Sequence, residues 1–381
     1  MYYFDNAATT AQKPPEVALA VYNALRSGDL GNPSRGAHGY SLNAYRHVLE
    51  SKELIKALFH GEDDYEVAFT QHATEALNMT LKGLIHRGDH VLTTTWEHNA
   101  VLRPLYQLED AGVALDFISS DPLTGALRYE EFAQKVRPET TYVVCNHGSN
   151  VTGNVLDLGW IKQFCKDHSL GLIVDVSQTA GAMPIDISDG IVTALCFTGH
   201  KSLYGPAGTG GICIRRDADV TPWMTGGDGI HSFEREQPHT APAVFEAGTA
   251  NVAGIMGLAA SVQLLLDGGL EKAAAHRRQL EELFVPAVQS LPGVTLYGDF
   301  TGLRVGTYSL NIEDAESAVV GDMLWERFGM ATRAGFHCAP LMHKALHTDV
   351  QGAVRFSFSL FTSARDVQEA VEALRALDGM I

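Results

Sequence analysis

The stretch Cys196-Phe197-Thr198-Gly199-His200-Lys201-Ser202-Leu203-Tyr204-Gly205-Pro206 places a lysine where a buried strand ends. The apolar run at 191–197 has the length and composition of such a strand. A lysine that leaves it loses hydration, which lowers the pKa of its amine. The neutral amine can then attack a carbonyl carbon and form a Schiff base. An ordinary surface lysine is the alternative, and other parts of the chain have to decide between the two.

Apolar runs alternate with helical patterns through the first two thirds of the chain. The predicted strands are 66–70, 90–94, 114–119, 140–147, 171–177, 191–197 and 209–215, and the predicted helices are 16–27, 41–59, 73–86, 97–111, 128–136 and 158–169. This alternation predicts an α/β fold, with a seven-stranded, mostly parallel sheet and helices on both faces. In such sheets, ligands bind at the carboxyl ends of the strands.

The pattern changes after residue 254. A long helical region at 255–291, broken at Gly268-Gly269, is followed by mixed short elements. These are strands at 294–298, 305–313, 331–335 and 353–359, and helices at 315–329 and 364–378. We expect a large α/β domain over residues 16–254 and a smaller C-terminal α+β domain over 255–381. Residues 1–15, a short arm, are assigned to the smaller domain.

The composition limits the classes of partner. Among 381 residues, 28 Lys and Arg stand against 45 Asp and Glu, a net charge of −17. This charge argues against nucleic acid or an anionic membrane as the main partner. We find no basic and apolar leader and no apolar run near the ~18 residues of a membrane span. Five cysteines without paired spacing fit a reducing compartment, so we expect a cytoplasmic protein.

A carboxylate ends the strand before the one that carries the lysine. Asp175 follows the apolar run 172–174, so two consecutive strands deliver Asp175 and Lys201 to one sheet edge. An ionised aspartate keeps a pyridine nitrogen protonated, so that the ring withdraws electrons. A cofactor phosphate needs the N–H groups of a helix start and nearby hydroxyls, which Thr74 and His200 can supplement. The pattern favours pyridoxal phosphate (PLP), whereas plain helix caps are the alternative for Asp175 and Thr74.

Three further polar residues have chemistry that suits an amino-acid substrate. His98 follows a strand end and can stack on a planar ring or move a proton, unless it is simply exposed. Asn150 can bind a carboxylate through its amide, or it can merely form a turn. Arg355 suits bidentate capture of a carboxylate, with a surface salt bridge as the alternative.

The loop Arg333-Ala334-Gly335-Phe336-His337-Cys338-Ala339-Pro340 surrounds a cysteine with basic residues. Neighbouring arginine and histidine stabilise a thiolate, which makes Cys338 a candidate nucleophile. Zinc is the competing idea, because His343 and His347 follow closely. However, the spacing matches no common zinc site and no second cysteine is near. We therefore expect no metal.

Together these motifs resemble the class V aminotransferase family, and within it the group II (SufS-like) cysteine desulfurases and selenocysteine lyases. The resemblance covers nearly the whole chain. It is carried by 4–9, 96–100, 175–178, 198–201, 245–249 and 333–340. The cysteine loop is similar to the group II pattern Arg-x-Gly-His-His-Cys-Ala, except that Phe336 stands where many members have a second histidine.

The resemblance implies a homodimeric, fold-type I PLP enzyme with its site at the subunit interface. Lys201 would hold the cofactor covalently, with Asp175 at the pyridine nitrogen, His98 on the ring face and Gln178 at the phenolic oxygen. The phosphate would be bound by Ala73, Thr74, Thr198 and His200 of the same chain. Thr249 of the partner subunit would complete the phosphate site. The substrate would meet Asn6, Ala7, Asn150, Arg333 and Arg355. Lys201 would move the α-proton, and Cys338 would attack the sulfur or selenium.

We therefore predict a cysteine desulfurase that converts L-cysteine to L-alanine and leaves a persulfide on Cys338. Iron–sulfur cluster assembly through a sulfur-acceptor protein is the expected context. A selenocysteine lyase acting on L-selenocysteine is one alternative, and another class V reaction, transamination or racemisation, would need Lys201 but not Cys338. A third alternative is a non-catalytic scaffold or sulfur-carrier partner that has lost the cofactor. A nicotinamide dehydrogenase is disfavoured, because no Gly-x-Gly-x-x-Gly follows the first strand.

Overall fold

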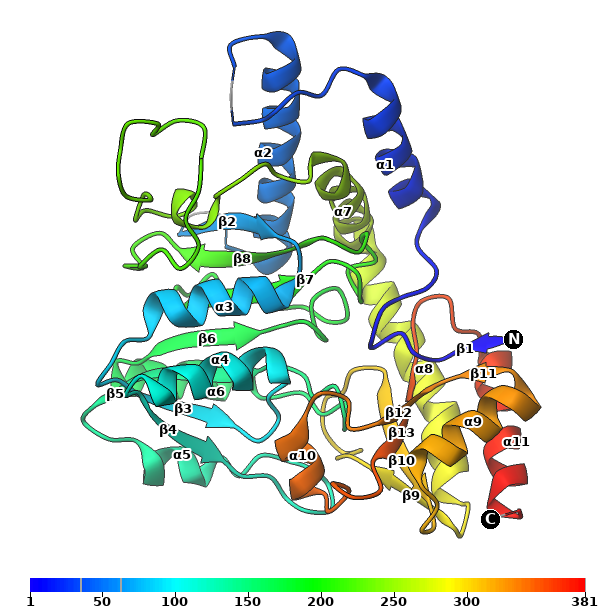
Figure 1. Ribbon diagram of the computed structural model, residues 1–381. Helices are drawn as coiled ribbons and strands as arrows, with labels where there is room; N and C mark the ends of the chain where they lie inside the picture. The colour runs from blue at the N-terminus through cyan, green and yellow to red at the C-terminus, as the bar shows by residue number, and fades with distance from the viewer. Residues whose placement is uncertain (35, 62–63, 381) are drawn as a thin grey trace.

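The computed structural model describes residues 1–34, 36–61 and 64–380, and a seven-stranded sheet lies at its centre (Figure 1). The strands, in their order across the sheet, are β2 (Tyr65–Thr70), β8 (Gly210–Arg215), β7 (Val192–Thr198), β6 (Gly171–Asp175), β5 (Thr140–Asn146), β3 (His90–Thr94) and β4 (Ala114–Ile118). Only β8 is antiparallel to its two neighbours, β2 and β7. The predicted mostly parallel α/β sheet is confirmed.

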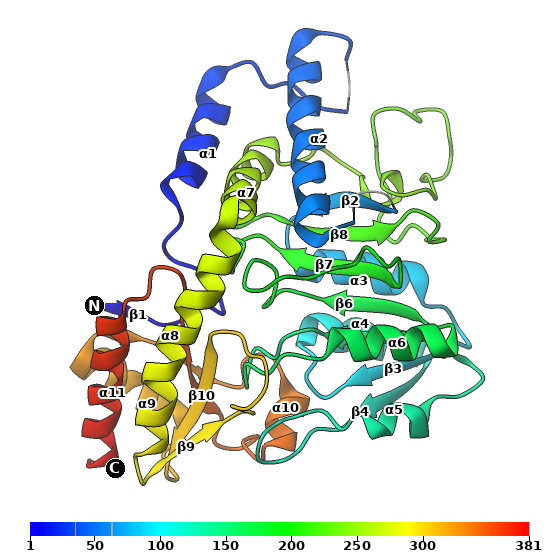
Figure 2. The ribbon, with the colours of Figure 1, turned by 180° about the vertical axis from the view of Figure 1, so that it is seen from behind.

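Helices cover both faces of this sheet (Figures 1 and 2). They are α2 (Gly39–Phe59), α3 (Ala73–Leu84), α4 (Asn99–Asp110), α5 (Glu130–Lys135), α6 (Leu158–His168) and α7 (Val252–Leu264), while α1 (Pro15–Ser27) packs on α7. Within β6, Leu172 and Val174 belong to the core that includes α2 and α6. Ile173, between them, belongs to the core that includes α3 and α4. Successive strand residues point to opposite faces, so a sheet covered on both sides requires an uninterrupted apolar run.

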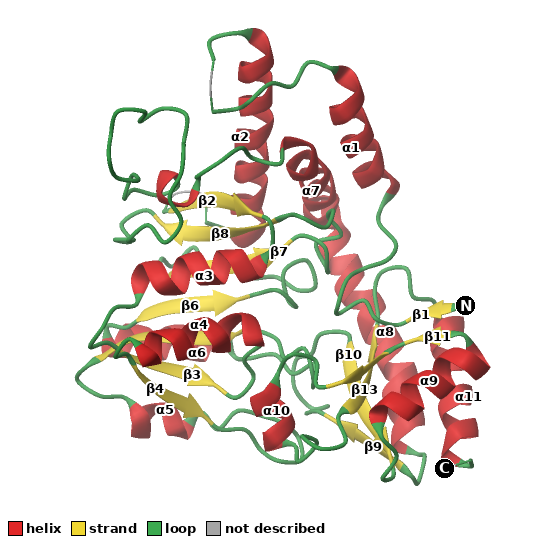
Figure 3. Ribbon diagram, viewed as in Figure 1, coloured by secondary structure: helices red, strands yellow, loops and turns green. Residues whose placement is uncertain are grey.

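A second sheet and core occupy the C-terminal part of the chain (Figure 3). The antiparallel sheet has the order β12 (Arg333–Gly335), β13 (Ala353–Ser357), β10 (Thr307–Ile312) and β9 (Val294–Tyr297). The helices of this core are α8 (Leu270–Gln289), α9 (Ser317–Phe328) and α11 (Ala364–Asp378), whereas α10 (Pro340–Ala345) packs through Met342 in the core of the large sheet. Phe4 of the N-terminal arm packs in this core. The exact boundaries of the two domains stay a prediction.

Three short elements escape the sequence patterns. The arm, expected to be a loop, contains β1 (Tyr2–Tyr3), which pairs in parallel with β11 (Met330–Ala331). A 3-10 turn, η1 (Ala243–Phe245), precedes α7, and the six-residue helix α10 follows the cysteine loop. All three are too short for a periodic hydrophobic pattern to register.

The helical run Val252–Gln289 joins the two parts and is, by length and composition alone, apolar enough to cross a membrane. It breaks at η2 (Leu265–Gly269), where Gly268 has φ of 88°, at the predicted place. Before the break, Leu258 lies in the core of the large sheet. After it, Phe284 lies in the core of the small sheet. Because each half contributes to a protein core, we interpret this run as a core helix.

The centre of the large sheet supplies a stability test. Leu172 is fully buried, so Leu172→Ala should lower the free energy of unfolding by about 3 kcal/mol through lost burial and a new cavity. Urea unfolding followed by circular dichroism measures the change. Leu123→Ala, at a side chain that is 80% exposed, is the control and should change it by less than about 0.5 kcal/mol. Equal losses in the two variants would contradict this account.

Candidate active site

A cavity of about 200 Å³ lies at the carboxyl ends of β5, β6 and β7, where the sequence predicts a site. The predicted residues that line it are Ala7, Ala73, Thr74, His98, Asn150, Asp175, Gln178, Thr198, His200, Lys201, Arg333 and Arg355. The N-terminal arm, the large sheet and the small sheet therefore meet around one cavity. Asn6, Thr249 and Cys338 are not part of its lining.

Lys201 follows β7, and its amine is buried at the cavity. Burial lowers the pKa of Lys201 to about 8, Arg355 acts in the same direction, and Asp175 opposes the shift. The arm fixes the backbone at this point, since Thr10 donates its N–H to the His200 carbonyl at 3.0 Å and its hydroxyl to the Lys201 carbonyl at 3.2 Å. The structure thus provides the partly neutral amine that attack on a carbonyl requires.

Asp175 ends β6 and is buried beside the cavity. Its Oδ1 accepts the Ser177 N–H at 2.9 Å and the Ser177 hydroxyl at 2.5 Å. Burial raises the pKa of Asp175, whereas these hydrogen bonds and Lys201 act against the shift. A buried carboxylate is stabilised by a cationic partner, so a protonated ring nitrogen would suit this position.

The N-terminus of α3 forms another wall of the cavity. His72 caps the helix, with its Nδ1 accepting the Glu75 N–H at 3.1 Å. Thr198 pairs with Gly210, whose backbone lies against His72, and its Oγ1 is buried with no hydrogen-bond partner within the described residues. Burial, with a smaller contribution from Lys201, lowers the pKa of His200 to about 4. Helix N–H groups, a free hydroxyl and a neutral imidazole form a donor set that fits a phosphate.

His98 caps α4, and its ring lines the cavity. Its Nδ1 accepts the Ala100 N–H at 3.0 Å, so the proton of the neutral ring is on Nε2. Burial, then Lys201, lowers the pKa of His98 to about 4. The ring is therefore uncharged at neutral pH and suited to stacking rather than to carrying a charge.

Glu97, next to His98 in the sequence, is fully buried, and we did not expect a role for it from the sequence. Its Oε1 accepts the Thr94 hydroxyl at 2.6 Å and the Asn146 N–H at 3.0 Å. Burial raises the pKa of Glu97 to about 8. The side chain ties the end of β3 to the end of β5. An acid beside a strand end within the motif at 96–100 is the signal that could have revealed it.

Arg355 and Asn150 form the part of the wall expected to bind a carboxylate. Arg355 is 2% exposed, so its contacts are not those of a surface salt bridge. Nη2 donates to Asp5 Oδ1 at 2.9 Å, Nη1 donates to the Asn150 carbonyl at 3.0 Å, and Nε has no partner within the described residues. One Asn150 amide N–H is already used, because Nδ2 donates to the His337 carbonyl at 2.7 Å. A carboxylate ligand would accept hydrogen bonds from the N–H groups of Arg355 and Asn150 that these contacts leave unused.

Cys338 is the partly exposed cysteine, whereas Cys145, Cys165, Cys196 and Cys213 are buried. It and His337 have positive φ of 56° and 49°, which is uncommon for residues other than glycine. The Cys338 carbonyl accepts the Asn99 N–H at 2.7 Å, so the loop lies against the start of α4. Although Cys338 does not line the cavity, His337 and Arg333 do, and the thiol therefore belongs to the edge of the site.

The histidines near Cys338 bind one another. His337 Nδ1 and His343 Nε2 lie 3.2 Å apart, and His343 Nδ1 lies 2.7 Å from the Thr348 hydroxyl. Over residues 1–34, 36–61 and 64–380, no group of three His, Cys, Asp or Glu side chains is placed to hold a metal ion. The ring nitrogens of His337 and His343 that face each other are engaged in a hydrogen bond rather than directed at a common metal position.

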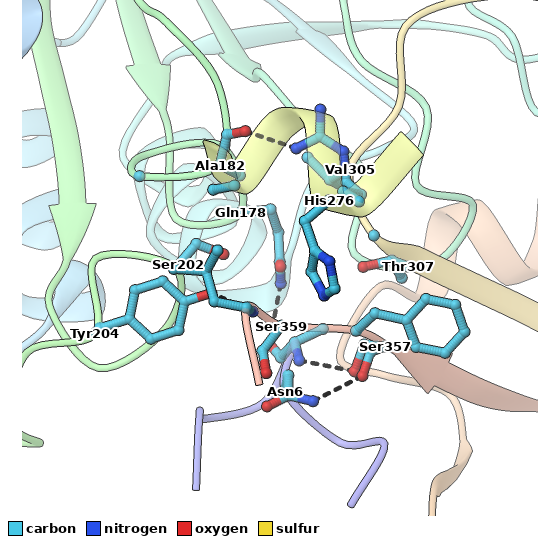
Figure 4. Close-up of a pocket in the computed structure, with 17 residues that line it drawn as sticks. Asn6, Gln178, Ala182, Ser202, Tyr204, His276, Val305, Thr307, Ser357 and Ser359 are labelled. Carbon is cyan, nitrogen blue, oxygen red and sulfur yellow. Dashed lines mark hydrogen bonds between the residues drawn. The ribbon is translucent and has the colours of Figure 1, made fainter. Parts of the chain in front are cut away.

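Asn6 and Thr249 lie outside the main cavity. Asn6 Nδ2 donates to the Ser357 carbonyl at 2.8 Å, beside a smaller cavity of about 40 Å³ that Gln178 also borders (Figure 4). Gln178 touches both cavities and donates through Nε2 to the Ala7 carbonyl at 3.1 Å. Asn6 thus anchors the arm. Thr249 is exposed between η1 and α7 and does not contribute to the cavity of its own chain.

Residues 2–370 match the family model described as Aminotransferase class-V. The chain belongs to this family, and the resemblance inferred from the motifs is confirmed. The arrangement of the large sheet is that of fold-type I PLP enzymes, as predicted.

Several similar proteins are named cysteine desulfurases. The chain is 31% identical over 390 residues to a "Probable cysteine desulfurase" of Methanothermobacter thermautotrophicus, covering 99% of this chain and 95% of the relative. It is 29% identical to the "Cysteine desulfurase IscS" of Vibrio atlanticus, with 98% and 91% covered. The apo structure of a cysteine desulfurase from Thermococcus onnurineus matches with a TM-score of 0.91 at 28% identity, covering 100% and 95%. The cysteine desulfurase CsdA (S-sulfonic acid) from Escherichia coli matches with a TM-score of 0.86 at 25% identity, again covering 100% and 95%.

The buried amine predicts a pH-dependent stability of the cofactor-free protein. The pKa of Lys201 is about 8 in the folded state against an ordinary value of 10.5, so between these pH values the unfolded chain binds more protons. The free energy of unfolding should therefore rise with pH in this window. Lys201→Met removes the effect, so the variant should be more stable than the parent below about pH 8, by a margin that shrinks towards pH 10.5.

Urea unfolding at several pH values measures this difference. Lys272→Met, at an exposed position on α8, is the matched control and should show no such pH-dependent margin. A margin for Lys201→Met that stays constant with pH would refute an amine whose pKa is lowered by burial.

Proposed function

We propose that this chain is a PLP-dependent cysteine desulfurase, which removes sulfur from L-cysteine, gives L-alanine and leaves a persulfide on Cys338. The observation that carries the proposal is one cavity that combines the buried pair Lys201 and Asp175 with a partly exposed cysteine at its edge. The names of the relatives support the same activity.

The residues around the cavity fit PLP. Lys201 would hold the cofactor, Asp175 would face its pyridine nitrogen, and His98 would stack on its ring. The phosphate would take the N–H groups at the start of α3 and the free hydroxyl of Thr198. When bound, the ring withdraws electrons from the α-carbon of the substrate and so weakens its bond to the α-hydrogen.

The remaining steps belong to side chains of this protein. Arg355 and Asn150 orient the substrate carboxylate. The neutral amine of Lys201 accepts the α-proton. The Cys338 thiolate attacks the substrate sulfur, so that a sulfur–sulfur bond forms while the bond from Cβ to sulfur breaks, and its electron pair stays on the substrate. Protonation of that carbon leads to alanine.

The persulfide then needs a recipient. Cys338 is partly exposed, and the neighbouring Phe336 is 48% exposed, so a second protein could reach the sulfur. We infer that an acceptor protein takes it and that iron–sulfur cluster assembly is the pathway served. Within the described residues the five cysteines form no disulfide, which fits a reducing compartment and supports a cytoplasmic location.

A homodimer would cover an apolar surface on α1 and α2. Its exposed residues are Leu19, Tyr22, Leu25, Tyr40, Leu42, Tyr45 and Leu49. Seven exposed apolar side chains concentrated on two helices are more typical of an interaction surface than singly scattered ones are. Thr249, which is exposed and does not line the cavity of its own chain, would then complete the phosphate site of the second subunit.

Two other functions remain as outcomes of experiment. Selenocysteine lyase activity would use the same residues, because selenium replaces sulfur at the same atom of the substrate. Transamination or racemisation would need Lys201 without Cys338. A scaffold that has lost its cofactor is opposed by the cavity, which keeps its buried lysine, its aspartate and its phosphate donors.

Substitution of Cys338 distinguishes desulfuration from transamination and racemisation, which do not need this residue. Cys338→Ala should reduce sulfide release from L-cysteine by at least about a hundredfold, because the nucleophile is lost. The assay measures sulfide and alanine in the presence of a reducing thiol. Cys165→Ala, at a buried cysteine in α6, is the control and should keep its turnover despite some loss of stability.

The same pair of variants is then compared on L-selenocysteine. Turnover of cysteine that survives in Cys338→Ala would overturn the persulfide mechanism. A parent protein that releases selenium but no measurable sulfide would assign the selenocysteine lyase activity instead.

The dimer predicts a second measurable effect. Leu25→Glu places a charge on the apolar surface of α1 and should raise the dissociation constant of the dimer by at least about tenfold. Sedimentation velocity over a range of concentrations measures it. Val319→Glu, at an exposed apolar residue on α9, is the control and should leave the dimer intact. A monomeric parent protein would contradict the proposal.

A further inference from the structure

A continuous line of hydrogen bonds runs behind the cysteine loop. The Thr348 hydroxyl lies 2.7 Å from His343 Nδ1, His343 Nε2 lies 3.2 Å from His337 Nδ1, and His337 Nε2 lies 3.1 Å from the Arg333 carbonyl. The side chains of Thr348, His343 and His337 are all buried. The line therefore begins beyond α10 and ends at the first residue of the cysteine loop.

The Arg333 carbonyl at the end of this line determines which atom donates in each of its hydrogen bonds. The Arg333 oxygen can only accept, so His337 Nε2 carries a hydrogen. In a neutral ring, His337 Nδ1 then accepts from His343 Nε2, and His343 Nδ1 accepts from the Thr348 hydroxyl. Burial holds the pKa of both imidazoles below the usual value, to about 4 for His343. One arrangement of neutral tautomers therefore satisfies the whole line, with Thr348 as its first donor.

This line fixes the residue before the cysteine. His337 is held through its ring by His343 and Arg333, and through its carbonyl by Asn150 at 2.7 Å. Its positive φ of 49° is followed by that of Cys338 at 56°. Such a pair of left-handed residues persists only where surrounding contacts determine it. Its conformation decides where the Cys338 thiol points.

Phe336 completes the arrangement. Its ring lies edge-on to His343 with centroids 5.7 Å apart. The apolar ring covers the imidazole without offering a competing hydrogen bond. This contact gives a physical reason for an aromatic residue at the position where the related loop pattern has a histidine.

We propose that Thr348 and His343 are positioning residues, which hold the Cys338 loop in the conformation that directs its thiol at the substrate sulfur. The inference rests on the proposed desulfurase function and deepens it. Neither residue lines the cavity, so neither touches substrate or cofactor. Their effect passes through the loop residues that His343 contacts, chiefly His337 and Phe336.

Thr348→Val tests the proposal, because valine keeps the shape and removes the first donor. Without that donor, His343 Nδ1 is left buried without a partner, so the orientation and tautomer of the His343 ring are no longer fixed and its bond to His337 weakens. We expect kcat for sulfide release to fall by roughly ten- to a hundredfold with little change in KM for cysteine, since displacement of a reacting group by about 1 Å has such effects. Thr348→Ser keeps the hydroxyl, and its kcat should return close to that of the parent.

A measurement independent of turnover accompanies the kinetics. Amide hydrogen exchange in the peptide covering 334–345, followed by mass spectrometry, should accelerate in Thr348→Val and not in Thr348→Ser. If Thr348→Val fails to fold, His343→Gln and His343→Leu replace the pair. The amide of glutamine can still donate to His337, whereas leucine cannot, so only the leucine variant should lose kcat.

The outcomes are distinct. A parental kcat in Thr348→Val, or an equal loss in Thr348→Val and Thr348→Ser, would overturn the positioning role. If instead Cys338→Ala itself retains turnover of cysteine, the proposed function fails before this inference is reached.

Discussion

The buried guanidinium of Arg355 ties together the parts from which the site is built. It extends from β13 of the small sheet, binds Asp5 of the N-terminal arm, and donates to the backbone of Asn150 in the large part of the chain. A buried charge is tolerated only when it is paired and hydrogen-bonded. Its contacts therefore require the arm, the Asn150 loop and the small sheet to meet in one arrangement, and the cavity exists because they do.

The chemistry is divided between distant parts of the chain. Lys201 and Asp175 end neighbouring strands of the large sheet, and they supply what a PLP enzyme needs in general. Cys338 belongs to a loop that follows β12 of the small sheet, and it supplies what a desulfurase needs in particular. This division lets one scaffold serve several reactions, since a change in the loop leaves Lys201 and Asp175 in place on the large sheet.

Much of this arrangement could be predicted from the sequence, because strands and helices have hydrophobic periods and the site residues follow strand ends. Lys201, Asp175 and Thr198 were found in this way. The pairing of Asp5 with Arg355, and of Thr348 with His343, has no period, because it depends on how distant segments meet. Glu97 was missed because the hydrophobic pattern does not show that an acid is buried, and only its place beside a strand end pointed to it. Asn6 was expected near substrate from its motif, yet its amide holds Ser357.

The interruption at Gly268 has a consequence for how the molecule works. The helical run on either side of it contributes to two different cores, so this glycine stands where the chain passes from one core to the other. The cysteine loop makes the return passage, because β12 before it belongs to the small sheet whereas Ala339 and Met342 after it pack in the core of the large sheet. The position of Cys338 is therefore set from both sides, and its distance from the amine depends on how the two cores pack together.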